Sequence, residues 1–169
     1  MIKIAISGPE SSGKTTLTKA LALDFNSPFA EEYARIHLEN NPNYSQEDLE
    51  IMAKGQLALW SKLPQSQIRF YDTEFMVFKI WSEEKYNSCS PLIENELKNQ
   101  RFDLYFICSP DIPWEYDPLR ENELDRDQLF EKYIALATKM KYPFKVLEGS
   151  HPERLATAIR EVEKILSTI

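Results

Sequence analysis

The sequence predicts an α/β fold in which one five-stranded parallel sheet carries helices on both faces. Short apolar runs alternate with stretches of helical periodicity about five times along the chain, an order typical of a parallel sheet. The run Asp103–Cys108 is almost wholly apolar, as expected of a central parallel strand. A length of 169 residues suits one domain, residues 1–169, with one sizeable core.

In the first half of the chain, apolar patterns and a capping signal predict three strands and two helices. Ile2–Ile6 is β-branched, as a buried strand requires, and a helix follows with Leu17, Leu21 and Phe25 at helical spacing. Residues 27–30 and 68–71 are the second and third strands. A capping signal at Ser45 begins a helix that we expect to run to about Leu63.

The second half continues the alternation. An aromatic-rich helix over 75–86 is expected to pack in the core, and a short helix over 91–100 precedes the fourth strand. A helix over 129–140, a strand over 144–147 and a last helix complete the chain. Ser150 and Glu153 stand at capping-box spacing, which marks the start of that last helix.

The stretch Gly8–Thr15 has the spacing of a phosphate-binding P-loop: Gly, four residues, then Gly-Lys-Thr. Backbone N–H groups of such a loop point at a phosphate, and the following helix directs the positive end of its dipole there. We expect Lys14 to reach the phosphates of ATP and the Thr15 hydroxyl to bind Mg²⁺. The residues expected to bind the nucleotide are Gly8, Glu10, Ser11, Ser12, Gly13, Lys14, Thr15 and Thr16.

Composition excludes other classes of protein. A net charge of −7 and a pI of about 5.0 argue against a nucleic-acid partner, which would need a basic surface. No apolar run is long enough to cross a bilayer, and the N-terminal strand lacks the basic flank of a signal peptide. We therefore expect a cytoplasmic protein with no membrane partner; a homo-oligomer is compatible with the sequence. Cys108 is expected to be a buried free thiol.

Carboxylates follow the second and third predicted strands, at the edge where ligands of open α/β sheets bind. Asp72 ends an apolar strand, which is the Walker-B arrangement that holds Mg²⁺ beside the P-loop threonine. Glu31 and Glu32 are candidates for a general base and for a substrate or Mg²⁺ contact, and Tyr33 and Arg35 are further substrate candidates. A solvated helix start is the alternative for these acids.

Gln56 lies on the apolar stripe of its helix, four residues after Met52 and four before Trp60. A polar amide on an otherwise apolar face needs a hydrogen-bond partner. The partner is either a neighbouring backbone group or a ligand, and Gln56 is therefore also a candidate substrate contact.

Residues 115–127 are dense in charge and show no apolar periodicity. We expect a short lid here, in which Arg120 and Arg126 close over phosphates and stabilise the negative charge that spreads during transfer. A solvated loop with internal ion pairs is the alternative.

A P-loop alone does not distinguish a kinase from a GTPase or a motor ATPase. The chain contains no Asn-Lys-x-Asp guanine signature, and a lid suits a kinase because it excludes the water that would hydrolyse ATP. The sequence therefore predicts a P-loop kinase-like fold and an ATP-dependent small-molecule kinase. A regulatory P-loop ATPase that acts through a protein partner is the alternative.

Four segments, in this order, resemble the ribosylnicotinamide kinase domain of bacterial NadR-like proteins, a P-loop ATPase/kinase group. They are Gly8–Thr15, Glu32–Arg35, Asp72–Glu74, and Ser109–Trp114 followed by Arg120. The resemblance covers nearly the whole chain. It implies an enzyme of NAD biosynthesis that uses Mg-ATP to phosphorylate the ribose 5′-hydroxyl of nicotinamide riboside, a nucleoside substrate.

The resemblance also implies roles by position. Glu32 and Asp72 would act near the hydroxyl and the metal, and Trp114 would lie near the substrate. The family commonly reads Trp-Glu-Tyr-x-Arg after the second strand, where the Trp contacts the pyridine ring; Glu31 stands in that place here. Asp-Thr-Asp of the family is replaced by Asp72–Glu74.

Overall fold

The computed structural model describes residues 1–118, 120–121 and 123–168. Its five strands pair in parallel in the order β2-β3-β1-β4-β5, which confirms the predicted sheet. The strands are β1 Ile2–Ser7, β2 Phe29–Ala30, β3 Ile68–Asp72, β4 Leu104–Cys108 and β5 Phe144–Leu147. The helices are α1 Lys14–Asp24, α2 Tyr33–Asn40, α3 Gln46–Ser61, α4 Phe75–Tyr86, α5 Pro91–Asn99, α6 Arg126–Met140 and α7 His151–Leu166.

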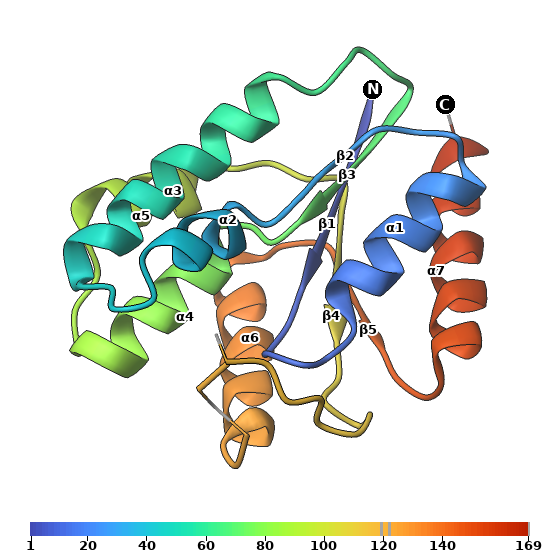
Figure 1. The fold of residues 1–169 in the computed structure, drawn as a ribbon. Coiled ribbons are helices and arrows are strands. Elements are labelled where there is room, and N and C mark those ends of the chain that lie inside the picture. The colour runs from blue at the N-terminus through green and yellow to red at the C-terminus, as the bar shows by residue number, and fades with distance from the viewer. Residues whose placement is uncertain (119, 122, 169) are drawn as a thin grey trace.

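Helices cover both faces of the sheet, as predicted (Figure 1). Successive side chains of a strand point to opposite faces, and β1 shows the consequence. Its isoleucines pack with Leu17 and Leu21 of α1 and with α7, whereas Ala5 packs with the cluster formed by α2 to α6. The chain thus has two apolar layers, one on each side of a sheet whose central strands are buried.

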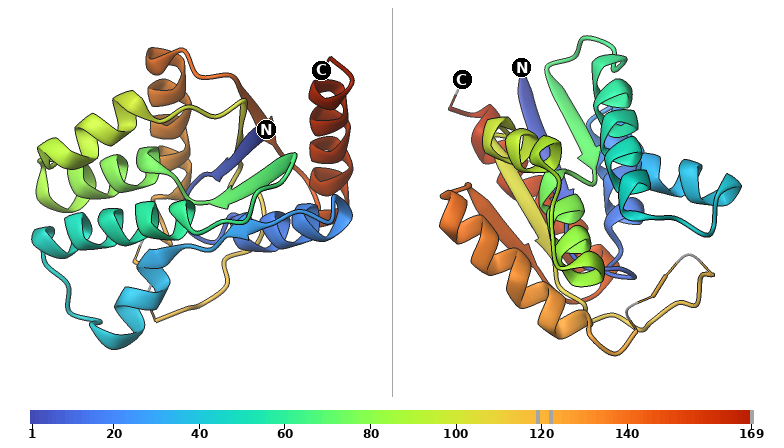
Figure 2. Two further views of the ribbon diagram at one scale, coloured as in Figure 1. Left: turned by 90° about the horizontal axis from the view of Figure 1, so that it is seen from above. Right: turned by 90° about the vertical axis from the view of Figure 1, so that its left-hand side faces the viewer.

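The carboxyl ends of the central strands meet at one edge of the sheet, opposite the two chain termini (Figure 1). The P-loop follows β1, which lies between β3 and β4: Ile6 is opposite Asp72, and Ser7 is opposite Ile107. The chain leaves β4 at this edge and passes the P-loop on the side of α2 before α6 begins (Figure 2). This edge therefore collects the segments that the sequence marked as functional.

The expected lid over 115–127 differs from the structure at its end. Arg126 and Asp127 already belong to the first turn of α6, while Leu119 and Asn122 lie outside the described residues. Both cysteines are free, and Cys108 is buried in β4, as expected. No helix in the described part of the chain is long and apolar enough to cross a membrane.

One glycine sets the contact between α2 and α3. A Cβ atom added at Gly55 would lie 2.1 to 2.5 Å from three ring carbons of Tyr33. The ring therefore rests directly on the backbone of α3. Because Tyr33 is the first residue of α2, this contact also holds the segment that carries Glu32.

We predict that Gly55→Ala destabilises the protein by about 1–3 kcal/mol, because the added methyl overpacks the Tyr33 contact. Helix propensity predicts the opposite sign, since alanine is favoured over glycine inside a helix by about 1 kcal/mol. The free energy of unfolding in urea measures the change. A stabilised Gly55→Ala variant would show that the ring does not rest on Gly55.

Candidate active site

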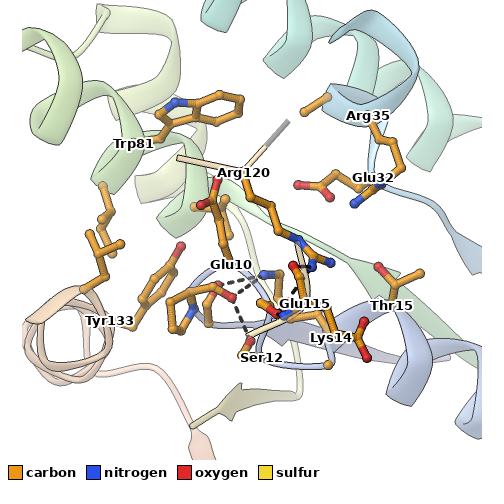
Figure 3. A pocket seen from close by; sticks show the side chains of 18 of the residues that line it. Glu10, Ser12, Lys14, Thr15, Glu32, Arg35, Trp81, Glu115, Arg120 and Tyr133 are labelled. Atoms are coloured by element: carbon orange, nitrogen blue, oxygen red, sulfur yellow. Dashed lines mark hydrogen bonds between the residues drawn. The ribbon is translucent and has the colours of Figure 1, made fainter. Parts of the chain in front are cut away.

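A cavity of about 400 Å³ opens at the carboxyl edge of the sheet. The P-loop forms its floor, and α2, α4, α6, the segment after β4 and the start of α7 contribute its walls. All eight residues predicted to bind the nucleotide line it. Figure 3 shows Lys14 and Thr15 at one side, with Glu32, Arg35 and Arg120 around the same space.

The P-loop has the tight backbone that its spacing predicts. Gly8 has φ of 131°, and a Cβ atom there would lie 2.6 Å from the carbonyl oxygen of Cys108, so only glycine fits. The Lys14 ammonium donates to the carbonyl oxygens of Gly8 at 2.9 Å and Pro9 at 2.8 Å. The lysine thus curls over the loop and presents its charge where a phosphate is cradled.

Arg154 is a site residue that the sequence analysis missed. Its guanidinium, 1% exposed, donates to the carbonyl oxygens of Ser12, Ser109 and Gly149 at 2.7, 2.9 and 2.8 Å and pairs with Asp111. It ties the P-loop to the loop that follows β4 and to the turn before α7. The spacing of the sequence could have indicated this burial, because Arg154 stands four residues before Ala158 on the buried face of α7.

Asp72 and Thr15 meet behind the loop. The Thr15 hydroxyl donates to Asp72 Oδ2 at 2.6 Å, and the other carboxylate oxygen, Oδ1, is buried with no partner among the described residues. Burial, and then the charge of Glu32, raise the pKa of Asp72. A hydroxyl beside a buried carboxylate with one free oxygen fits Mg²⁺, a cation that prefers oxygen ligands and would favour the charged carboxylate.

The described residues contain no group of three or more His, Cys, Asp or Glu side chains able to hold a metal alone. A Mg²⁺ ion at Thr15 and Asp72 would complete its shell with phosphate oxygens and water, which is its usual mode in nucleotide sites.

Gln56 bonds backbone groups, the first of its two alternatives. Its Oε1 accepts from the Tyr33 N–H at 2.8 Å, and its Nε2 donates to the Glu31 carbonyl at 2.9 Å. The side chain is fully buried and does not line the cavity. It fixes the backbone on both sides of Glu32.

The four substrate candidates at the start of α2 differ in position. Glu32 and Arg35 line the cavity, whereas Glu31 is exposed outside it and the Tyr33 ring lies on Gly55.

The described part of the segment expected to be a lid is mostly exposed, and several of its residues also bind the body of the protein. Arg120 lines the cavity and donates to Ser11 Oγ at 3.3 Å, and Asp117 pairs with Arg35 at 2.8 Å. Arg126 donates to the backbone carbonyls of Ser11 and Ile112, each at 3.1 Å. Of the two predicted lid arginines, Arg120 is therefore the one that lines the cavity.

Trp114 does not line the cavity. Its ring centroid is 5.9 Å from the Arg120 guanidinium carbon and 5.5 Å from that of Arg126. These are cation–π distances, so the tryptophan supports the two arginines from outside.

A second set of contacts joins the lid segment to α4. The Glu121 N–H donates to Glu10 of the P-loop at 2.9 Å, and its carboxylate accepts from the Tyr44 hydroxyl at 2.8 Å and from Lys85. Burial raises the pKa of Tyr44 to about 12, so its phenol remains a donor. Trp81, on the helix expected to pack in the core, packs against the core cluster and also lines the cavity.

The fold and the site together define a P-loop nucleotide-binding protein of the kinase-like α/β type. Residues 3–154 match the family model AAA_28, described as an AAA domain. The chain belongs to this family.

The resemblance to NadR proteins is confirmed. The chain is 25% identical over 173 aligned positions to the "Trifunctional NAD biosynthesis/regulator protein NadR" of Salmonella typhimurium and 26% identical to that of Escherichia coli. Each match covers 96% of this chain and 42% of the relative. The chain therefore spans about two fifths of the length of these curated relatives.

Solved structures give the same result for the fold. A NadR protein in complex with NAD and AMP-PNP has a TM-score of 0.82 at 25% identity, covering 96% of this chain and 49% of that one. A NadR protein in complex with NR has a TM-score of 0.77 at 24% identity, covering 96% and 51%. Deoxyadenosine kinase from M. mycoides (0.71, 14%, covering 97% and 100%) confirms the P-loop kinase-like fold.

We predict that Asp72→Asn separates stability from metal-dependent nucleotide binding. Without nucleotide, its free energy of unfolding should stay equal or rise by about 1 kcal/mol, because an amide escapes the cost of a buried charge. The additional rise in melting temperature that Mg²⁺ gives over ATP with EDTA should disappear. Asp24→Asn, at the exposed end of α1, is the control, and a full Mg²⁺-dependent rise in Asp72→Asn would contradict the assignment.

Proposed function

We propose that this protein is an ATP-dependent nucleoside kinase that phosphorylates the ribose 5′-hydroxyl of nicotinamide riboside or a similar nucleoside. One observation carries the proposal: the P-loop and the Glu32 carboxylate line the same cavity, which is covered by an arginine-bearing segment. That arrangement has a donor half and an acceptor half. The NadR relatives support the choice of acceptor, since they are named for NAD biosynthesis and one was solved with NR.

The residues divide the work of phosphoryl transfer between them. Lys14 and Arg120 would stabilise the charge on the transferring γ-phosphoryl group. Thr15 and Asp72 would hold Mg²⁺, which supplies charge neutralisation at the phosphates. Glu32 would orient the ribose hydroxyl and accept its proton as the 5′-oxygen bonds to phosphorus and ADP leaves. The contacts of the lid segment would keep water out of the cavity.

Among the carboxylates, the geometry favours Glu32 as the acceptor-side group. Asp72 is 1% exposed and bonded to Thr15, whereas Glu32 lines the cavity. Arg35 lines the same wall and pairs with Asp117, so it would link the acceptor side to the lid.

ADP release measured across a nucleoside panel tests the proposal. Nicotinamide riboside should raise turnover well above the rate with ATP alone, and Lys14→Ala should lose the stimulated rate while keeping its fold, as judged by circular dichroism. Lys19→Ala, exposed on the same helix, is the control. If no nucleoside raises turnover, the kinase proposal fails and the regulatory ATPase becomes the better explanation.

Glu32→Gln and Glu31→Gln form a matched pair that assigns the base. Glu32→Gln should lower kcat by about 100-fold with a small change in the acceptor KM, because general-base catalysis contributes about 10²–10⁴-fold. Glu31→Gln should retain nearly full kcat, since its carboxylate is exposed and outside the cavity. The reverse ranking of the two variants would move the base to Glu31.

A further inference from the structure

The cavity contains an apolar compartment that the phosphate chemistry does not use. Its lining residues come from α2, α4 and α6 and are Leu38, Val77, Ile80, Trp81, Leu129 and Tyr133. In Figure 3, Trp81 and Tyr133 lie across the cavity from Glu32 and Thr15. The cavity therefore has a polar end, which suits the hydroxyls of a ribose, and an apolar end, which suits a flat aromatic base.

The strand order of the sheet indicates whether this compartment binds the base of the acceptor nucleoside or the base of the donor nucleotide. Trp81 is on α4, which follows β3, and Glu32 follows β2; both strands lie on one side of β1. Ile112 and His151 also line the cavity, but they lie in the loop after β4 and directly after β5, on the other side of β1. Helix α6 also follows β4, but its Leu129 and Tyr133 pack in the same apolar cluster as α4 and therefore belong to the Trp81 side. Phosphates at the P-loop would lie between these two sides. A base near Trp81 then belongs to the acceptor, and the base of the donor is left to the other side.

The indole of Trp81 is held in a defined orientation. Its Nε1–H donates to the Tyr44 hydroxyl at 2.9 Å, and the two rings meet at 5.2 Å in a T-shaped pair. Lys85 lies 3.7 Å from the centre of the Tyr44 ring and also binds Glu121. The Tyr44 hydroxyl in turn donates to Glu121. One tyrosine therefore holds both the indole and the lid segment.

Tyr133 adds a polar group to the same compartment. Its side chain projects from α6 toward the cavity in Figure 3, while the residue is only 4% exposed. Burial raises the pKa of its phenol well above the ordinary value, so the hydroxyl remains protonated. It can donate a hydrogen bond to a polar substituent of a base that stacks nearby.

We propose that Trp81 is the surface on which the aromatic base of the acceptor nucleoside stacks, and that Tyr44 is a positioning residue that holds this indole and links it to the lid. The inference rests on the proposed kinase function and names the part of the cavity that selects the acceptor. Stacking on an aromatic side chain changes the affinity for a base by about tenfold or more. Trp81 should therefore govern acceptor binding and have little influence on the donor.

The experiment compares Trp81→Leu with Trp81→Phe, using calorimetric binding and steady-state kinetics with nicotinamide riboside, adenosine and cytidine as probes. Trp81→Leu should raise the acceptor Kd and KM by about tenfold or more and leave the KM for ATP nearly unchanged. Trp81→Phe should recover most of the loss. Trp60→Phe is the matched control, because Trp60 packs on Tyr71, Phe75 and Phe102 and does not line the cavity.

The role of Tyr44 is tested by a double-mutant cycle. Tyr44→Phe keeps the ring but removes the acceptor of the indole N–H, and should raise the acceptor KM a few-fold with a smaller effect on kcat. In the Trp81→Phe background, which has no N–H to lose, the same change should have a smaller effect. Full additivity would show that Tyr44 does not act through Trp81.

The failures of the two proposals are distinguishable. If ribosides bind in a Trp81-dependent way but are not phosphorylated, the kinase proposal fails and the stacking role stands. If ribosides are phosphorylated and Trp81→Leu keeps the wild-type acceptor KM, the stacking role is wrong. The stacking role is also wrong if Trp81→Leu raises only the KM for ATP, because that result would place the base of ATP at Trp81. The same conclusion follows if no riboside binds the wild-type protein.

Discussion

The site depends on one buried guanidinium. Arg154 directs four of its five N–H donors to three backbone carbonyls and one carboxylate, and these acceptors belong to three separate loops. Asp111 completes the arrangement by accepting the Gly149 N–H at 2.6 Å as well. A buried charge is tolerated only when its hydrogen bonds are satisfied. The P-loop, the loop that follows β4 and the turn before α7 are therefore held in one relative arrangement.

Within that frame, polar contacts at the rim place the lid segment. Arg120 and Arg126 bind the P-loop, Asp117 binds Arg35, and Glu121 binds Glu10, Tyr44 and Lys85. These contacts reach both the P-loop and the helices α2 and α4. Solvent-accessible polar contacts contribute little individually and open readily. In the proposed kinase, such a segment would close over a filled cavity and open again to release product.

The side of the cavity that carries Glu32 and Trp81 is organised by residues that do not line the cavity. Gln56 binds the backbone before and after Glu32, and the Tyr33 ring rests on Gly55. Both interactions fix the start of α2, so the Glu32 carboxylate is presented by a rigid support. The hydroxyl of Tyr44, which lies just before α3, fixes the indole of Trp81 on α4 in the same way. Residues behind the wall of the cavity thus determine what the wall can recognise.

The sequence by itself determined the elements whose signals are local. The P-loop spacing, the Asp at the end of β3, the alternation of strands and helices and the resemblance to NadR all lie in short segments. They were sufficient to predict the fold and to predict that the P-loop lines the cavity. The tertiary structure alone decided that Gln56 binds backbone, that Glu32 lines the cavity and Glu31 does not, that Trp114 supports two arginines, and that Trp81 and Arg154 belong to the site. The physical reason is that each of these roles depends on contacts between residues far apart in the chain. Helical periodicity shows which face of a helix is covered, but what covers it is decided only when the helices pack.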